Sequence, residues 1–256
     1  MGLEVSENGG GGGGAEFYRL NAKLGCVQSN EMGPDGKALK GEDGKNIKKH
    51  HEMNTALTGY LVGLSVVDNV FEGAINKQLR LKLKDDKGGP NMFVDLPFGS
   101  EANGASAFGL SVMAKLNAAG LDQPVSLVPW NMPAGTKMGN RPATEKAMTG
   151  CVVKQGGVKL VEDYGNGETK LPQLQPVLQA NGKPVMVGGK ELKDKAPWED
   201  LAFALLDTLT AKVSPSHQDV ETGAEPEHES DEGIDVDDMT AGTQVAAAAR
   251  PGFAAR

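Results

Sequence analysis

The stretch QLRLKLK, at residues 78–84, alternates strictly between polar residues and leucines. Successive side chains of a β-strand point to opposite faces, so the three leucines share one face and the three cations share the other. The leucines are Leu79, Leu81 and Leu83, and the cations are Arg80, Lys82 and Lys84. The alternation predicts a strand that is buried on its leucine face. It leaves a row of positive charges on the open face of a sheet, in a chain of net charge −8.

The negative charge lies in the C-terminal part of the chain. Residues 214–256 contain ten of the 34 acidic residues and, as cations, only Arg250 and Arg256, whereas residues 1–213 are neutral overall. An acidic total therefore does not exclude an anionic ligand for the body of the protein. The regular apolar pattern also ends at Val213, so we expect residues 214–256 to form a disordered acidic tail.

Composition indicates a soluble protein with one sizeable domain. Hydrophobic residues make up 39% of the chain, and no apolar run approaches the ~18 residues of a membrane span. The two cysteines, Cys26 and Cys151, are far apart, which suits free thiols in a reducing compartment. Residues 1–15 lack the apolar stretch of a secretion signal, and their glycine run at 9–14 predicts a disordered leader. We therefore expect a cytoplasmic protein.

Patterns typical of catalysis or metal binding are missing from the sequence. The four histidines are divided between the adjacent pair at 50–51 and the tail, and no HExxH, GxSxG or zinc-ligand spacing occurs. A turn explains the acidic pair at 85–86, and the start of a helix explains the acidic pair at 199–200. The sequence therefore predicts no enzyme, no metal site and no cofactor.

Regular elements follow one another from residue 56 onward. Strands are expected at 56–71, 76–86, 91–98, 123–132 and 147–164, the last as one strand or a hairpin, and helices at 106–120 and 196–213. Three strands, a helix and two strands is the order of the OB-fold, a five-stranded barrel; other small barrels and α+β folds are alternatives. The predicted fold is mainly β with two helices.

Four regions are expected along the chain. The leader at 1–15 precedes an OB-fold-like nucleic-acid-binding domain at 16–164, which begins with an extended segment at 16–30 and a polar loop at 33–51. An extension at 165–213 carries an amphipathic helix that packs on the barrel or on a partner subunit. The acidic tail follows.

The basic strand then lies on the face that OB-folds use for oligonucleotides. Cations there neutralise phosphates, and aromatic rings stack on the bases of a single strand. The candidate cations are Lys77, Arg80, Lys82, Lys84 and Lys87, with Lys48 and Lys49 from the polar loop. The candidate aromatics are Tyr60, Phe71, Phe93, Phe98 and Trp130. A solvated strand face explains the cation row equally well, and each aromatic is also a candidate for the core.

Several segments together carry a resemblance to a known class of protein. They are the glycine-containing strand 59–71, the basic strand 78–86, MFVDLPF at 92–98, the helix ending at Gly120, PVSLVPW at 124–130 and the acidic run 219–239. In this pattern the chain resembles the single-stranded-DNA-binding proteins of bacteriophages. The resemblance implies sequence-tolerant binding and protection of single-stranded DNA during phage DNA replication, recombination or repair, without catalysis. It also implies a location in the cytoplasm of the host cell.

The acidic tail is expected to compete with DNA for the basic groove, or to recruit replication or recombination proteins through residues 219–239. A solubilising tail is the alternative. The tail departs from the family pattern, because the acidic run continues into TAGTQVAAAARPGFAAR and Phe253 is not terminal. For the whole protein, the alternatives are a structural or virion component with a basic subunit-contact face, and a recombination mediator that anneals strands. The oligomeric state stays open, a homo-oligomer included.

Overall fold

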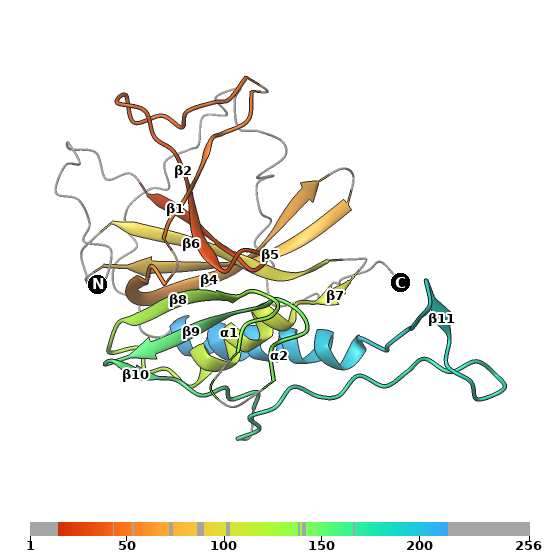
Figure 1. The fold of residues 1–256 in the computed structure, drawn as a ribbon. Coiled ribbons are helices and arrows are strands. Elements are labelled where there is room, and N and C mark those ends of the chain that lie inside the picture. The colour runs from red at the N-terminus through yellow and green to blue at the C-terminus, as the bar shows by residue number, and fades with distance from the viewer. Residues whose placement is uncertain are drawn as a thin grey trace.

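A long coiled sheet with both helices on one side of it makes up the body of the protein (Figure 1). The computed structural model describes residues 15–214 except 43, 53, 72–73, 86–89, 101–102, 138, 140–141 and 166, and omits the side chains of Val70, Phe71 and Ala74. The strands are β1 (Glu16–Asn21), β2 (Cys26–Asn30), β3 (Lys48–His50), β4 (Leu57–Phe71), β5 (Ala74–Lys84), β6 (Asn91–Ser100), β7 (Gly104–Ala105), β8 (Val125–Met132), β9 (Met148–Gln155), β10 (Val158–Lys159), β11 (Met186–Val187) and β12 (Lys190–Glu191). The helices are α1 (Ala107–Asn117) and α2 (Ala196–Val213). The prediction of a mainly β fold with two helices is confirmed.

The strand order agrees with that of the predicted barrel except at the pair of strands that would close it. The sheet runs β10-β9-β8-β4-β5-β6-β1-β2-β3, with β7 also paired to β6. The five predicted strands therefore lie in the order β9-β8-β4-β5-β6, and closing them into a barrel would require β6 to pair with β9. Among the described residues no such pair exists, because β6 pairs in parallel with β1. The barrel is open at this edge.

The alternating strand behaves as its sequence predicts. Leu79, Leu81 and Leu83 of β5 are completely buried and belong to the same core cluster as the buried residues of α1. On the neighbouring β4 the register shifts between Leu61 and Gly63, which is the bulge that the glycines of this strand indicate. The position of the strand within the sheet therefore follows from its hydrophobic pattern.

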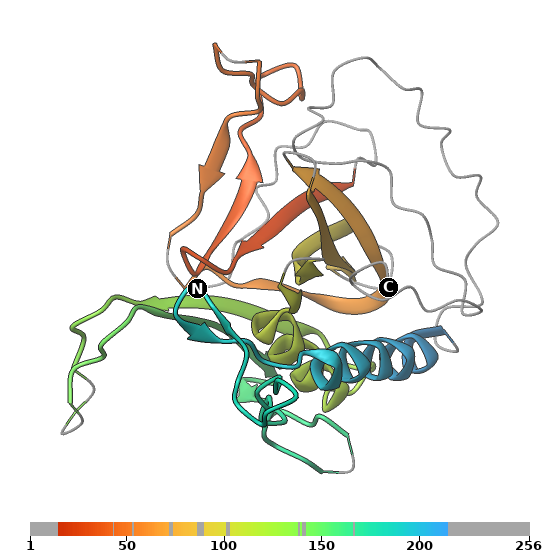
Figure 2. The same ribbon diagram turned by 90° about the vertical axis from the view of Figure 1, so that its right-hand side faces the viewer.

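The N-terminal part of the fold departs from the prediction. Residues 16–30 are not one extended segment but the hairpin β1–β2, which turns at Gly25 with a φ of +61°. A β-carbon at Gly25 would clash with the backbone of Trp130 on β8, so this turn packs closely against the other half of the sheet. The predicted loop at 33–51 contains isolated backbone bridges and ends in β3, so that it extends the hairpin into an arm that rises away from the helices (Figures 1 and 2).

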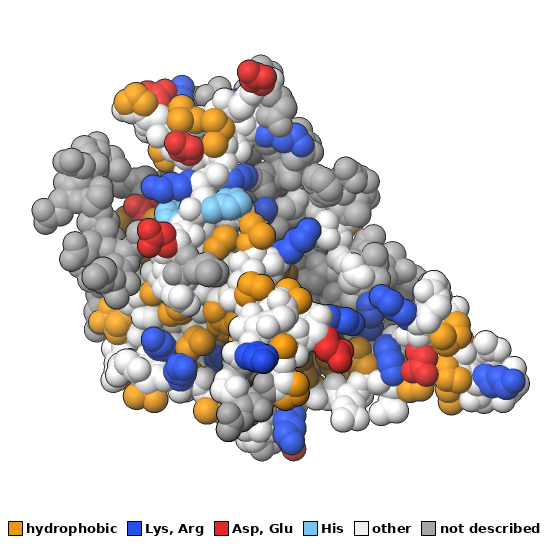
Figure 3. Space-filling view, viewed as in Figure 1, with side chains coloured by type: hydrophobic (Ala, Val, Ile, Leu, Met, Phe, Trp, Pro, Cys, Tyr) orange, Lys and Arg blue, Asp and Glu red, His pale blue; other side chains and the backbone are white. Residues whose placement is uncertain are grey.

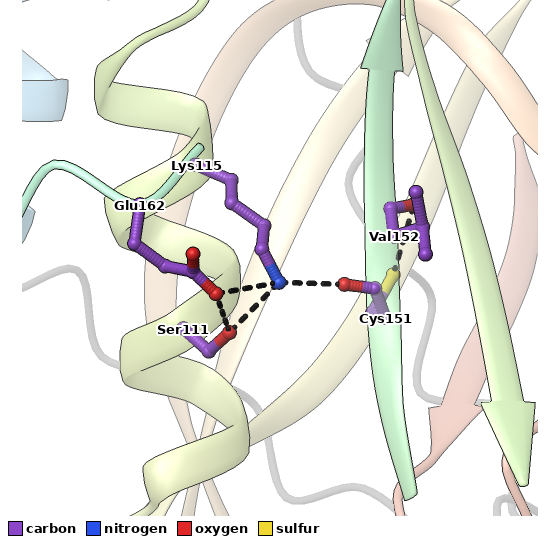
Figure 4. Close-up of polar contacts among 5 residues, drawn as sticks. All are labelled: Ser111, Lys115, Cys151, Val152 and Glu162. Atoms are coloured by element: carbon purple, nitrogen blue, oxygen red, sulfur yellow. Dashed lines mark hydrogen bonds and ion pairs between the residues drawn. The ribbon is translucent and has the colours of Figure 1, made fainter. Parts of the chain in front are cut away.

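Both helices pack into the same core as the sheet. Ser106 caps the start of α1, and α1 ends at Asn117, before the predicted Gly120. Lys115 holds α1 against β9: its ammonium donates to the carbonyl oxygen of Cys151 at 2.9 Å and to Ser111 Oγ at 2.9 Å, and pairs with Glu162 at 3.1 Å (Figure 4). Burial raises the pKa of the Cys151 thiol to about 12, so this cysteine stays protonated.

Helix α2 packs against α1 and against the core of the sheet. Its buried residues Ala202, Leu205 and Leu209 join the core of the sheet domain. Lys212 donates hydrogen bonds to the carbonyl oxygens of Asn117 and Ala119, which satisfies the C-terminal end of α1. The apolar stripe predicted for residues 196–213 is therefore covered by this chain's own elements.

Candidate nucleic-acid interface

The cationic side of β5 belongs to a surface that four strands build together. Cross-strand register sets neighbouring side chains of β4, β5, β6 and β1 in rows across the sheet, on the face away from the buried leucines. The rows are Tyr60–Lys84–Asn91, Gly63–Lys82–Phe93–Phe17 and Ser65–Arg80–Asp95–Arg19. We call these three rows the outer face. The predicted row of three cations thus lies at the centre of a single surface.

A pair of aromatic rings lies on the outer face. Phe17 of β1 and Phe93 of β6 are direct partners in the parallel register, and their rings stack with centroids 5.0 Å apart and an interplanar angle of 19°. Phe17 is 42% exposed and Phe93 is half-buried, so the stack is partly open to solvent. The guanidinium carbon of Arg80 lies 5.5 Å from the Phe17 centroid and 5.8 Å from that of Phe93, within cation–π distance.

Phe17 was not among the predicted candidates. The segment at 16–20, EFYRL, contains the signal that identifies it, because Phe17 and Arg19 alternate with Tyr18 and Leu20. Leu20 is completely buried, so the alternation places Phe17 and Arg19 on the outer side of β1. No local pattern in the sequence indicates that β1 lies beside β6.

Arg80 is not the open cation that the sequence predicts. Its guanidinium forms two hydrogen bonds with the carboxylate of Asp95, Nε to Oδ1 at 2.7 Å and Nη2 to Oδ2 at 2.9 Å. Asp95 is 3% exposed, and the Arg80 side chain is 19% exposed. A buried carboxylate requires such a partner, so Arg80 has a structural role as well as its contact with both rings of the stack.

Two further cations of this region are also held by the protein. Burial lowers the pKa of the Arg19 guanidinium below its ordinary value; Asp95 opposes this effect and the nearby charge of Arg80 adds to it. Arg19 remains charged at any physiological pH. Lys77, predicted to extend the basic row, pairs with Asp68 at 3.1 Å and its side chain is only 14% exposed. Lys82 and Lys84 are half-buried. Lys87 lies outside the described residues.

The remaining predicted aromatics have different surroundings. Phe98 is completely buried and packs edge-on against Phe203 at 5.7 Å, so the prediction that it stacks on bases is wrong. Trp130 is half-buried on β8, with its ring against Gly150, where an added β-carbon would lie 2.6 Å from it. Tyr60 is half-buried in the Lys84 row. The side chain of Phe71 lies outside the described residues.

The register of the outer face continues onto the arm. Arg19 is opposite Gln28, and Gln28 is opposite His50, whose Nε2 lies 2.7 Å from the Gln28 amide nitrogen. Lys48 and Lys49, the two predicted loop cations, are exposed on β3, two strands beyond β1. Figure 3 shows the histidines of this arm among lysine or arginine side chains, below a group of hydrophobic side chains. These lysines are therefore near the outer face without being part of the stack.

No family profile, curated protein or solved structure matches the chain in comparisons with known proteins. Of the two helices in the described part, neither combines the length and hydropathy needed to cross a bilayer. Within the described residues, histidine, cysteine, aspartate and glutamate do not gather in groups of three or more that could hold a metal ion. The outer face is therefore the main structural indication of function.

Proposed function

We propose that the protein binds single-stranded DNA across the outer face, with little dependence on base sequence, and protects it during phage DNA replication, recombination or repair. The observation that carries the proposal is the exposed Phe17–Phe93 stack within rows of lysine and arginine. A ring open to solvent offers a π-face to any base, and stacking on such a ring contributes about 1–3 kcal/mol per base. Cations in the adjacent rows neutralise the phosphates of the same strand. Binding of this kind requires no catalysis and no cofactor.

The strand order supports an OB-fold-like arrangement as part of the proposal. Strands β4, β5 and β6, helix α1, and strands β8 and β9 follow in the sequence order of that fold, and the second and third strands are those that bind oligonucleotides in it. In this chain those strands are β5 and β6, which carry Arg80, Lys82, Lys84 and Phe93. Strand β1 takes the place at the edge of β6 and adds Phe17.

The acidic residues at 219–239 lie outside the described part of the chain. We propose that they compete with DNA for the outer face, or recruit replication or recombination proteins once DNA has displaced them. Both roles follow from a negative segment tethered to a positive surface, where the effective concentration is high.

A salt titration against fluorescent oligo-dT, with duplex DNA of the same length beside it, tests the proposal. Affinity for the single strand should be the higher of the two and should fall steeply with salt. Phe17→Leu keeps an apolar side chain at an exposed position and removes the ring, so it should weaken affinity by a factor of about 5 to 150, the equivalent of roughly 1–3 kcal/mol. The matched control is Phe108→Leu, which removes a half-buried aromatic from α1 and should leave affinity within about twofold of the native protein. Unchanged affinity in the Phe17 variant would overturn the assignment of the face.

A second candidate function is a structural or interaction protein with a basic subunit-contact face. The exposed apolar side chains favour it: Met32 is 57% exposed on the arm, and Leu178 and Val187 are 57% and 60% exposed in the extension around β11 and β12. Such groups are typical of contacts between proteins. The same titration separates the candidates, because a structural protein would show little affinity for either form of DNA at any salt concentration.

A further inference from the structure

A groove opens on the outer face where β1 separates from β6. The two strands pair from Glu16–Met92 to Arg19–Asp95, and from Gly99 onward β6 pairs with β7. Between these two partners the edge of β6 has no neighbouring strand among the described residues. The groove occupies this gap and has a volume of about 490 Å³, within the range of about 300–1,000 Å³ that is usual for small-ligand sites.

The walls of the groove combine apolar and amide groups. The apolar part comes from Leu96, Pro97 and Ala105, and the polar part includes Asn21, Asn76 and Gln78. Backbone N–H groups of Lys23 and Leu24 donate to the amide oxygen of Asn21 at 2.9 and 2.8 Å, which fixes this side chain in place. A lining of apolar and amide groups suits a nucleobase, whose faces are apolar and whose edges carry donors and acceptors.

Arg19 connects the groove to the aromatic stack. It lies two residues from Phe17 on the same side of β1, lines the groove, and donates from Nη2 to Gln78 Oε1 at 3.4 Å. Lys23, which is exposed, also lines the groove, at the β1–β2 turn. A DNA strand that runs from the stack across Arg19 therefore reaches the groove after a short step, with two cations among the lining residues for its phosphates.

We infer that this groove holds one nucleobase of the bound single strand, turned away from its neighbours, next to the bases stacked on Phe17 and Phe93. The inference rests on the proposed function. The amide oxygens of Asn21 and Gln78 accept from the protein, and their N–H groups can donate to the acceptor that the edge of every nucleobase carries, so the groove takes a base of any kind, in keeping with sequence-tolerant binding. A duplex can fill it only after a base pair opens, which costs a few kcal/mol, so the groove also favours single strands.

A fluorescent base analogue tests the inference with the full-length protein. 2-Aminopurine is quenched while it stacks on other bases and brightens when it leaves them. Within oligo-dT, a single 2-aminopurine should brighten on saturation with the native protein. The series Ala22→Val, Ala22→Leu and Ala22→Phe fills the groove from its β1 end in steps, and the brightening should decrease with the size of the new side chain. The matched control is Ala118→Phe, at an exposed position after α1 and outside the groove, which should brighten like the native protein.

The possible outcomes separate the groove from the proposed function. If the oligonucleotide does not bind at low salt, the proposed function and the inference both fail. If it binds and Phe17→Leu weakens binding, but the native complex shows no brightening, the proposed function stands and the groove assignment is overturned. Equal brightening across the Ala22 series also overturns it. Melting temperatures of the variants identify any loss of folding, and the Val and Leu variants keep the series informative if the Phe variant is unstable.

Discussion

Replacement of Arg80 with methionine should destabilise the protein, although the sequence places Arg80 in a row of surface cations. The reason is Asp95, which is 3% exposed and accepts both guanidinium hydrogen bonds. Methionine fills a similar volume and leaves the carboxylate without its cation. Lys84, four residues further along β5 on the same face, is opposite Asn91 in the register, so the same substitution there removes a charge without exposing a buried carboxylate.

The expected loss follows from the burial of the pair. Breaking a buried ion pair by removing one partner costs about 3–5 kcal/mol. Because the Arg80 side chain is still 19% exposed, water reaches part of the site, and the lower end of that range, about 3 kcal/mol, applies. For a domain of this size, about 2–4 °C in Tm corresponds to each kcal/mol, so Arg80→Met should lower Tm by roughly 6–12 °C. Lys84→Met should stay within about 0.5 kcal/mol of the native protein.

Urea unfolding followed by tryptophan fluorescence measures these differences, since the chain contains Trp130 and Trp198. The double variant Arg80→Met/Asp95→Asn removes the buried charge together with its partner and should recover at least half of the loss. A single variant as stable as the native protein would refute the reasoning, and so would a double variant no more stable than the single one. Charge reversal at Arg80 is for the same reason a poor test of DNA binding, because it would lower stability and affinity together.

Three further predictions concern α1 and the core. The pKa of Glu162 is lowered in the folded protein, because hydrogen bonds and the charge of Lys115 outweigh burial, which raises it. The contribution of Glu162 to stability is therefore complete above its ordinary pKa of 4.5 and is lost as the pH falls through the lowered pKa of the folded protein. Lys115→Met should make the free energy of unfolding less dependent on acid pH, measured by urea titrations at a series of pH values. Gly109→Ala should cost about 1–3 kcal/mol in the same assay, because the new β-carbon meets the carbonyl oxygen of Pro97, and unchanged stability would contradict that contact. Phe98→Ala should lower the free energy of unfolding by about 3–5 kcal/mol without altering the oligonucleotide affinity of the folded protein. Loss of affinity at unchanged stability would show instead that Phe98 contacts the DNA.

Local patterns in the sequence determine much of this fold. The alternation of β5 identifies its buried side, and the apolar stripe at 196–213 identifies α2 with its observed ends. In MFVDLPF, the alternation also shows that Phe93 and Phe98 point to opposite faces, so they cannot both bind DNA. Which face is buried depends on Leu79 and Leu81 across the register, and that pairing is not visible in a single strand.

The parts that the sequence did not predict depend on contacts between distant segments. The pairing of β1 with β6 joins residues near 17 to residues near 93, and no local pattern specifies it. The stack and the groove depend on that pairing, whereas the Arg80–Asp95 pair lies across β5 and β6. Asp95, a lone acidic residue in a strand of apolar side chains, is the one local sign that a cation lies opposite.

Strand β1 is held to the sheet by a short parallel pairing, so a bound ligand can change how readily this strand opens. Only four register pairs join β1 to β6, and detaching them would separate the two stacked rings while the leucine core of β5 stays folded. A base stacked on the outer side of Phe17 adds contacts to β1 where it joins β6 and opposes this local opening. Occupancy should therefore slow amide hydrogen exchange in β1 while exchange in β8 and β9 is unaffected, so that the first strand of the domain reports whether the surface is filled.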